Sequence, residues 1–172
     1  MKNKELNKAA KRMLDLIDSG TTSMTSEDVA PYYVDIKTYT DNEIFELEKQ
    51  KLFKERPLLM AFSSDVKDSG DFITNEDTGI PIIITRNKKG TVKAYLNVCR
   101  HRGGRLLDKP CGNQSRGFVC PYHAWRYDLD GDLISIYGEE TFGEIDRSLH
   151  SLIELPVEEK YGLIYVQPTP GP

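Results

Sequence analysis

Long hydrophobic runs are missing from this 172-residue sequence. No stretch approaches the ~18 consecutive apolar residues that a membrane-spanning helix needs, so no membrane span is predicted. The Lys-rich start, Met1 to Arg12, has no apolar segment behind it and no small-residue cleavage site, unlike a secretory signal. We therefore expect a cytoplasmic protein.

An excess of positive charge is also missing, and cysteine is scarce. The 23 Lys and Arg residues against 27 Asp and Glu give a formal net charge of −4. Because binding to nucleic acid or anionic lipid needs a basic surface, we exclude both as default partners. Three cysteines are too few for the disulfide framework of a small secreted domain. The chain is nevertheless long enough to bury a hydrophobic core without disulfides.

The first part of the sequence predicts two helices. Apolar residues at three- and four-residue steps mark the first one: Leu6, Ala9, Ala10, Met13, Leu14 and Ile17. We expect an amphipathic docking helix that ends at Gly20, and then an extended connector over residues 21–40. A second helix is expected to start at Thr40, which has capping-box spacing to Glu43, and to end before Pro57.

From Leu58 onward, short β-rich runs alternate with turn residues. The predicted strands are 58–62, 82–85, 91–98, 118–120, 125–128, 132–136 and 163–167. Asn87 to Gly90 and Leu129 to Gly131 contain residues that tolerate the positive φ of tight hairpins. The pattern predicts a mainly β protein, an antiparallel barrel or sandwich preceded by two helices.

Two short segments combine cysteine with histidine. One residue separates Cys99 from His101, and two separate Cys120 from His123. Each segment follows a predicted strand, and residues 102–119 between them are long enough to run out and back. The four side chains are ligands that zinc or an iron–sulfur cluster would take. From these residues alone, a structural Cys2His2 zinc site remains open beside the cluster.

The surrounding residues resemble the N-terminal Rieske domain of ring-hydroxylating oxygenase α subunits. The resemblance rests on NVCRHRG (97–103), FVCPYHAW (118–125), YDLDG (127–131) and YGLI (161–164), with support from GDF (70–72) and GIP (79–81). It covers about residues 40–168. Ala124 stands where Gly is common, and the catalytic domain that normally follows is missing.

The resemblance implies a [2Fe–2S] cluster in which Cys99 and Cys120 hold one iron and His101 and His123 hold the other. Since neutral imidazoles add no charge, reduction takes such a site from neutral to singly negative, whereas an all-cysteine cluster goes from doubly to triply negative. Rieske potentials are accordingly higher, roughly −150 to +300 mV against about −400 mV for plant-type ferredoxins. The flanking residues favour this interpretation over zinc, which does not need them.

The resemblance also predicts the domain organisation. A helical segment with its connector covers residues 1–56, a Rieske domain covers 57–168, and its cluster-binding subdomain covers about 97–136. Residues 169–172 are expected to be a linker-like tail, because three of the last five residues of the sequence are Pro and one is Gly.

Several neighbours of the two segments carry weaker predictions. Cys111 is expected to be a free, partly buried thiol, because Cys99 and Cys120 are taken as ligands. Trp125 is expected to pack as a wall beside the cluster, and Gly103 to allow a tight turn. Gly104 is expected to share this turn, and Arg100 and Arg102 are expected either to steer a redox partner or to support the loop. We expect His150 to be a surface histidine. A hairpin is predicted from Tyr127, Asp128, Asp130 and Gly131.

Function follows from the histidine count. Oxygenases of this family activate O2 at a mononuclear Fe(II) held by two His and one carboxylate. With three histidines in the chain and two assigned to the cluster, only His150 remains. We therefore expect a relay of single electrons, from a ferredoxin or a flavin/NAD(P)H reductase to a mononuclear iron in a missing domain or partner chain. The alternatives are a free-standing Rieske ferredoxin and a structural zinc module.

Overall fold

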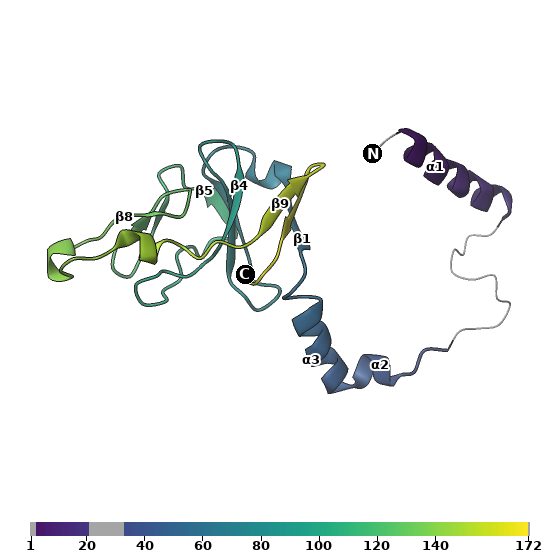
Figure 1. The fold of residues 1–172 in the computed structure, drawn as a ribbon, viewed down its shortest axis with the longest axis horizontal. Helices are drawn as coiled ribbons and strands as arrows, with labels where there is room; N and C mark the ends of the chain where they lie inside the picture. Colours follow the sequence, from purple (N-terminus) through teal and green to yellow (C-terminus); the bar gives the residue numbers. More distant parts are fainter. Residues whose placement is uncertain (1–2, 21–32, 172) are drawn as a thin grey trace. The chain divides into compact units, whose positions relative to one another are not determined.

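The computed structural model describes residues 3–20 and 33–171, which belong to two separate units, 1–40 and 41–172 (Figure 1). The first unit contains α1 (Asn3–Asp18) and the single turn α2 (Lys37–Thr40). Helix α1 is confirmed, and it ends where Gly20 adopts a φ of 68° and donates its N–H to the Ile17 carbonyl. Its larger apolar side chains, Leu6, Met13, Leu14 and Ile17, are all more than half exposed.

The expected extended connector is wrong over residues 37–40, which form α2. The Asp35 carboxylate starts this turn by accepting the Lys37 N–H at 2.9 Å. Residues 21–32 of the expected connector lie outside the described residues. None of the helices among residues 3–20 and 33–171 is long and apolar enough to cross a membrane.

Helix α3 (Asn42–Lys51) begins the second unit, and its predicted N-terminus is corrected by one residue. Asp41 caps it, because the Asp41 carboxylate accepts the N–H groups of Glu43 at 2.8 Å and Ile44 at 3.4 Å. The Thr40 hydroxyl instead donates to the Ile36 carbonyl at 3.3 Å, inside the preceding turn. An ionised carboxylate interacts more favourably than a hydroxyl with the positive end of the helix dipole.

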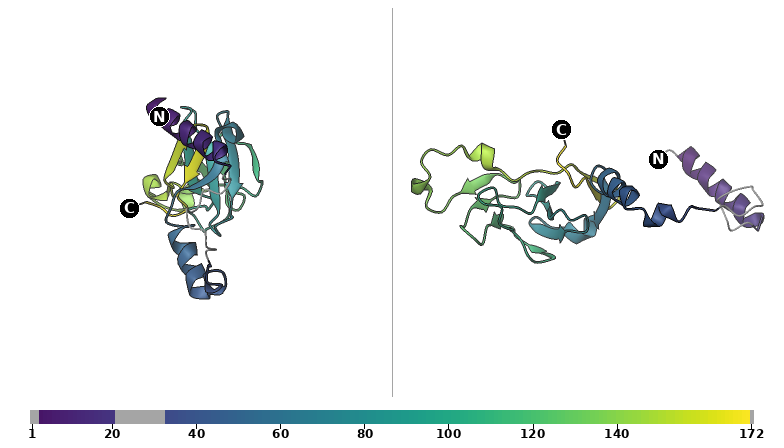
Figure 2. Two further views of the ribbon diagram at one scale, coloured as in Figure 1. Left: turned by 90° about the vertical axis from the view of Figure 1, so that its right-hand side faces the viewer. Right: turned by 90° about the horizontal axis from the view of Figure 1, so that it is seen from below.

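The rest of the second unit is mainly antiparallel β structure, as predicted (Figures 1 and 2). The strands are β1 (Leu58–Phe62), β2 (Asp71–Asn75), β3 (Ile82–Arg86), β4 (Val92–Leu96), β5 (Cys111–Asn113), β6 (Phe118–Val119), β7 (Arg126–Tyr127), β8 (Leu133–Ser135), β9 (Val157–Lys160) and β10 (Leu163–Val166). They form three sheets in the orders β1-β10-β9, β4-β3-β2-β5 and β6-β7-β8. Short 3-10 helices lie at η1 (Ser63–Val66), η2 (Glu139–Thr141) and η3 (Arg147–His150).

All seven predicted strands occur, but β2, β5 and β9 were not predicted. Strand β9 reads Val-Glu-Glu-Lys and has no apolar alternation, so only its pairing with β10 defines it. Strand β5 is short and exposed, and it depends on pairing with β2. Cross-strand partners far along the chain therefore create the elements that local sequence does not mark.

Two apolar clusters form the core, one on each side of the four-stranded sheet. Strand β3 separates them, because Ile82 and Ile84 belong to one cluster and Ile83 to the other. The first is completed by β1, β4 and β10 side chains such as Ala61, Ala94 and Ile164. The second contains Tyr95, Trp125 and Tyr127 together with the cysteines 99 and 120. Two of the candidate ligands, Cys99 and Cys120, thus lie in the buried core.

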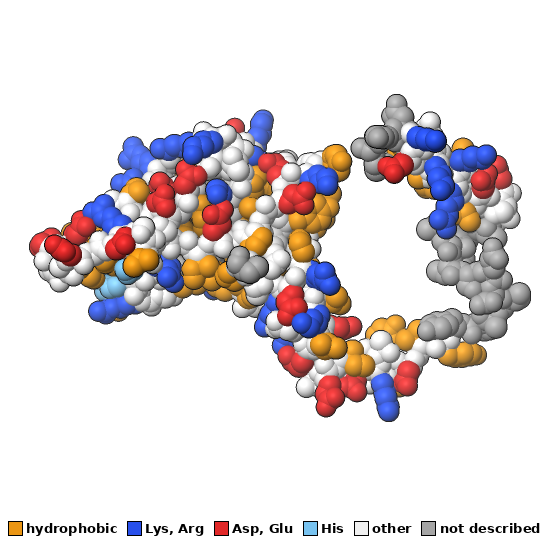
Figure 3. Space-filling model, viewed as in Figure 1, with side chains coloured by type: hydrophobic (Ala, Val, Ile, Leu, Met, Phe, Trp, Pro, Cys, Tyr) orange, Lys and Arg blue, Asp and Glu red, His pale blue; other side chains and the backbone are white. Residues whose placement is uncertain are grey.

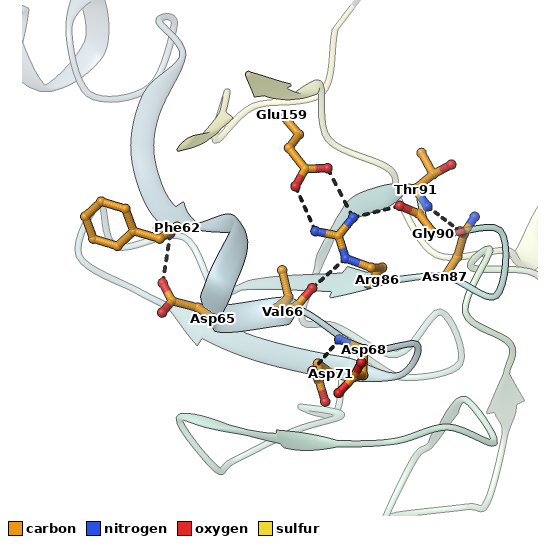
Figure 4. Close-up of polar contacts among 10 residues, drawn as sticks. All are labelled: Phe62, Asp65, Val66, Asp68, Asp71, Arg86, Asn87, Gly90, Thr91 and Glu159. Atoms are coloured by element: carbon orange, nitrogen blue, oxygen red, sulfur yellow. Dashed lines mark hydrogen bonds and ion pairs between the residues drawn. The ribbon is translucent and has the colours of Figure 1, made fainter. Parts of the chain in front are cut away.

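The Arg86 side chain links the sheet that contains β3 to the sheet that contains β9 (Figure 4). Its guanidinium binds the Glu159 carboxylate at 2.7 and 3.1 Å, and it also donates to the carbonyls of Val66 at 2.6 Å and Gly90 at 2.7 Å. Hydrogen bonding to Arg86 lowers the pKa of Glu159, and hydrogen bonding to Glu159 raises the pKa of Arg86. The group joins β3 to β9 and to η1.

Candidate metal centre

The two Cys–His segments form loops with the same backbone hydrogen bonds. In the first loop, which follows β4, the Cys99 N–H donates to the Gly104 carbonyl at 2.7 Å and the Gly103 N–H donates to the Cys99 carbonyl at 3.0 Å. In the loop between β6 and β7, Cys120 makes the equivalent bonds with Trp125 at 2.8 Å and Ala124 at 3.0 Å. Each loop therefore turns back on itself after its cysteine, while the histidine lies two positions after the cysteine in the first loop and three positions after it in the second.

Both loops need a left-handed residue four positions after the cysteine. Gly103 has a φ of 72° and Ala124 a φ of 53°. Glycine adopts this conformation without a steric penalty, whereas an alanine pays for its Cβ. The predicted role of Gly103 in a tight turn is confirmed, and a glycine at position 124 would fit the same loop geometry without strain.

The four predicted ligands lie together as a thiol pair and an imidazole pair. Cys99 and Cys120 form the thiol pair, and each is free and only 2% exposed. The ring centroids of His101 and His123, the imidazole pair, are 4.8 Å apart with planes at 68°. Among residues 3–20 and 33–171, no three His, Cys, Asp or Glu side chains gather as ligands of one metal ion.

Burial and neighbouring charges act on these groups. Burial raises the pKa of the Cys99 thiol, and the nearby Cys120 raises it further, while the Tyr127 hydroxyl acts in the opposite direction. Burial also lowers the pKa of His101, with contributions from His123 and Arg102. The imidazole therefore favours its neutral form, which is the form that binds metals. The Nδ1 atom of His123 is buried and has no hydrogen-bond partner in the described part of the chain.

Tyr127 contacts the thiol pair, a role that was not predicted. Its hydroxyl lies 3.2 Å from Cys99 Sγ and accepts the Arg100 N–H at 3.0 Å. The residue is fully buried, and burial raises the pKa of its hydroxyl, so it stays protonated. Residues two apart in a strand share a face, so the place of Tyr127 two positions after Trp125 in the predicted strand is the one feature of the sequence that points to this contact. The hairpin prediction for Tyr127 does not include it.

Trp125 forms a wall behind the imidazole pair, as predicted. It is 2% exposed, and its ring stacks on His101 with a centroid distance of 4.8 Å and an interplanar angle of 6°. His150 packs edge-on against Trp125 at 5.6 Å and is half-buried, so its prediction as a plain surface histidine is wrong. Cys111 is free, as predicted, but exposed rather than partly buried, because β5 lies at the edge of its sheet.

The imidazole pair faces a cavity of about 1060 Å³. Arg102 and Tyr122 line it from the two loops, while Tyr137, Glu140 and Phe142 line it from the segment after β8. Figure 3 shows histidine atoms at the surface beside hydrophobic side chains, at the end of the unit that carries β8. The thiol pair lies in the core and the imidazole pair lies toward solvent.

Comparison with known families shows to which family the chain belongs. Residues 56–146 match the sequence pattern of the Rieske [2Fe-2S] domain family. The chain belongs to this family. The match spans both Cys–His loops and all strands from β1 to β8.

Relatives of this Rieske domain are α or oxygenase subunits. It is 34% identical over 133 residues to the benzene 1,2-dioxygenase subunit alpha of Pseudomonas putida, and the matched region covers 77% of this chain and 29% of the relative. It is 33% identical over 133 residues to the carnitine monooxygenase oxygenase subunit of Escherichia coli K12, covering 77% and 35%. The chain thus spans about a third of the length of these relatives.

Solved structures agree with this assignment. A crystal structure of the quaternary ammonium Rieske monooxygenase CntA with an inhibitor has a TM-score of 0.74 at 32% identity, covering 80% of this chain and 38% of that chain. A naphthalene 1,2-dioxygenase mutant bound to phenanthrene has a TM-score of 0.67 at 34% identity, covering 73% and 29%. The predicted Rieske-type fold is confirmed.

Proposed function

We propose that this Rieske domain relays single electrons through a [2Fe–2S] cluster held by Cys99 and Cys120 on one iron and by His101 and His123 on the other. When bound, such a cluster supplies reversible one-electron transfer near the potential of the other Rieske centres. The observation that carries the proposal is the buried, unpartnered Nδ1 of His123, next to His101 and above a buried thiol pair. A buried polar atom without a partner costs about 1–3 kcal/mol, which a metal ligand bond removes.

The donor set fits this cluster. Two thiols in an apolar core suit one iron, because as thiolates they neutralise charge where water is excluded. Two imidazoles at the floor of the cavity suit the other iron, because they add no charge and reach the surface. The thiol pair then holds the inner side of the cluster, and the imidazole pair forms the side where electrons enter and leave.

The length of the relatives supports the proposal for the electron acceptor. The chain covers 29–35% of relatives named as α or oxygenase subunits, so a catalytic part would lie outside these 172 residues. We propose that the electron acceptor is a mononuclear iron in such a domain or in a partner chain, and that a ferredoxin or a flavin/NAD(P)H reductase is the donor. The 172 residues alone then transfer electrons and hydroxylate nothing.

Metal analysis of the purified chain tests the proposal. We expect two irons and two labile sulfides per chain, a red-brown colour, and a reduced-state EPR spectrum with an average g below 2. His101→Ala and Cys120→Ala should abolish the signal, while His150→Ala and Cys111→Ser, which remove a histidine and a cysteine outside the ligand set, should retain it. Full iron content in His101→Ala, or a colourless chain loaded with zinc, would contradict the proposal.

A further inference from the structure

A strap of residues 138–147 runs across the imidazole side of the site. It begins after β8 and contains η2, and Phe142 follows at the end of this short helix. Phe142 touches two rings of the site: its centroid lies 5.6 Å from His101 at 74° and 5.8 Å from Trp125 at 69°. The strap therefore adds an aromatic edge to the stack of His101 on Trp125.

Ion pairing and backbone conformation fix the position of the strap. The Arg147 guanidinium binds the Glu139 carboxylate through Nη2 at 2.6 and 2.8 Å and donates to the Ile134 carbonyl of β8 at 3.1 Å. Gly138 and Gly143 flank the helical turn, each with a φ of 69°. Because other residues adopt this φ only with strain, these two glycines determine where Phe142 is presented.

Three rings now surround His101. Trp125 covers one face, while His123 and Phe142 approach it edge to face. Phe142 is 39% exposed and lines the cavity together with His101, so its ring occupies space beside the imidazole that water would otherwise fill. An apolar ring in this position replaces water next to the imidazole and lowers the local dielectric.

We propose that Phe142 is a positioning residue for His101, which it holds against Trp125 while it limits the access of water to that imidazole. The inference rests on the proposed function, in which His101 is an iron ligand. Reduction adds one negative charge to the site, and water stabilises added charge better than a phenyl ring does. Phe142 therefore holds the reduction potential below the value that an open site would have.

Replacement of Phe142 in the cluster-loaded chain tests the role. Phe142→Ala should shift the reduction equilibrium about threefold toward the reduced state, which is about 28 mV at 59 mV per tenfold for one electron. It should also deepen the deuterium modulation in pulsed EPR after transfer to D2O, because more water reaches the histidine. Phe142→Leu, which keeps an apolar side chain, should restore most of both readouts. Phe53→Ala, at a phenylalanine of similar exposure (47%) in the C-terminal turn beyond α3, is the control and should change neither.

A second variant moves the strap without altering Phe142. No atom lies within 4 Å of a Cβ added at Gly143, so Gly143→Ala acts only through its φ. We expect both readouts to shift in the same direction as in Phe142→Ala. Gly79→Ala is the matched control: its φ is 77°, its added Cβ also meets nothing within 4 Å, and it lies in the turn between β2 and β3. It should lose stability without a change in potential.

The outcomes separate the two levels of the argument. A wild-type chain that binds no cluster overturns the proposed function and this role with it. A wild-type chain that binds the cluster, with wild-type potential and modulation in Phe142→Ala and Gly143→Ala, overturns the role of Phe142 alone.

Discussion

Tyr127→Phe removes the hydrogen bond between the Tyr127 hydroxyl and Cys99 Sγ, together with the bond that this hydroxyl accepts from the Arg100 N–H. The substitution removes a single oxygen from a fully buried ring and leaves the packing of that ring in place. In the wild type, this oxygen already accepts the Arg100 N–H, and a metal-bound Cys99 thiolate carries no proton. The Tyr127 hydroxyl must then donate its hydrogen to Cys99 Sγ, 3.2 Å away.

The size of the effect follows from the strength of that bond. Hydrogen bonds to charged groups contribute about 1.5–3 kcal/mol, and the bond strengthens when reduction adds negative charge to the site. If about 1–2 kcal/mol of it is specific to the reduced state, Tyr127→Phe lowers the midpoint potential by about 40–90 mV, at 59 mV per tenfold for one electron. The sign is opposite to that expected for Phe142→Ala.

Redox titration followed by EPR measures this shift, and Tyr95→Phe provides the control. Tyr95 is another buried tyrosine, and its hydroxyl donates to the Leu129 carbonyl at 3.2 Å, away from both cysteines. Both variants should lose stability, but only Tyr127→Phe should change the potential. Equal potentials for Tyr127→Phe and the wild type would refute the reasoning, as would a shift of the same size in Tyr95→Phe.

Three further predictions concern the scaffold. Asn97→Ala removes a buried side chain that binds two loop amides and one loop carbonyl. It should lower the free energy of unfolding by about 3 kcal/mol in chemical denaturation and reduce the iron content. Unchanged iron content would contradict its role in the first loop. Ala124→Gly relieves a φ of 53° and should raise the melting temperature, by up to about 1 kcal/mol of stability, with full cluster content; a lower melting temperature would contradict the strain. Glu159→Gln should destabilise the chain at neutral pH. Because Arg86 lowers the folded-state pKa of Glu159, the wild type should lose this advantage as the pH falls through that pKa, below about 4.3; a difference in stability that is constant with pH would contradict it.

The two Cys–His loops could be predicted from the sequence because the spacing of their residues is local. Cys99 and His101 lie on one turn, Cys120 and His123 on another, and the residues around them are constrained by the same turns. The strands β1, β3 and β10 could be predicted for a similar reason, since each is a short apolar run in the sequence.

The residues that were missed depend on contacts across the fold. Tyr127 reaches Cys99 over 28 positions of sequence, and Phe142 reaches His101 only because the strap folds back over the site. Strands β5 and β9 exist through their partners. No local pattern marks such contacts, and the cap at Asp41 shows that two adjacent polar residues can compete for one role.

Pulsed EPR on the reduced chain, with histidine labelled by 15N, tests the assignment of the ligands most directly. Coupling of the unpaired electron to two histidine nitrogens, both kept in His150→Ala, is the predicted result, and His123→Ala, like His101→Ala, should lose the signal altogether. A spectrum without histidine coupling, as four sulfur ligands would give, or with the same two couplings in His123→Ala, would contradict it.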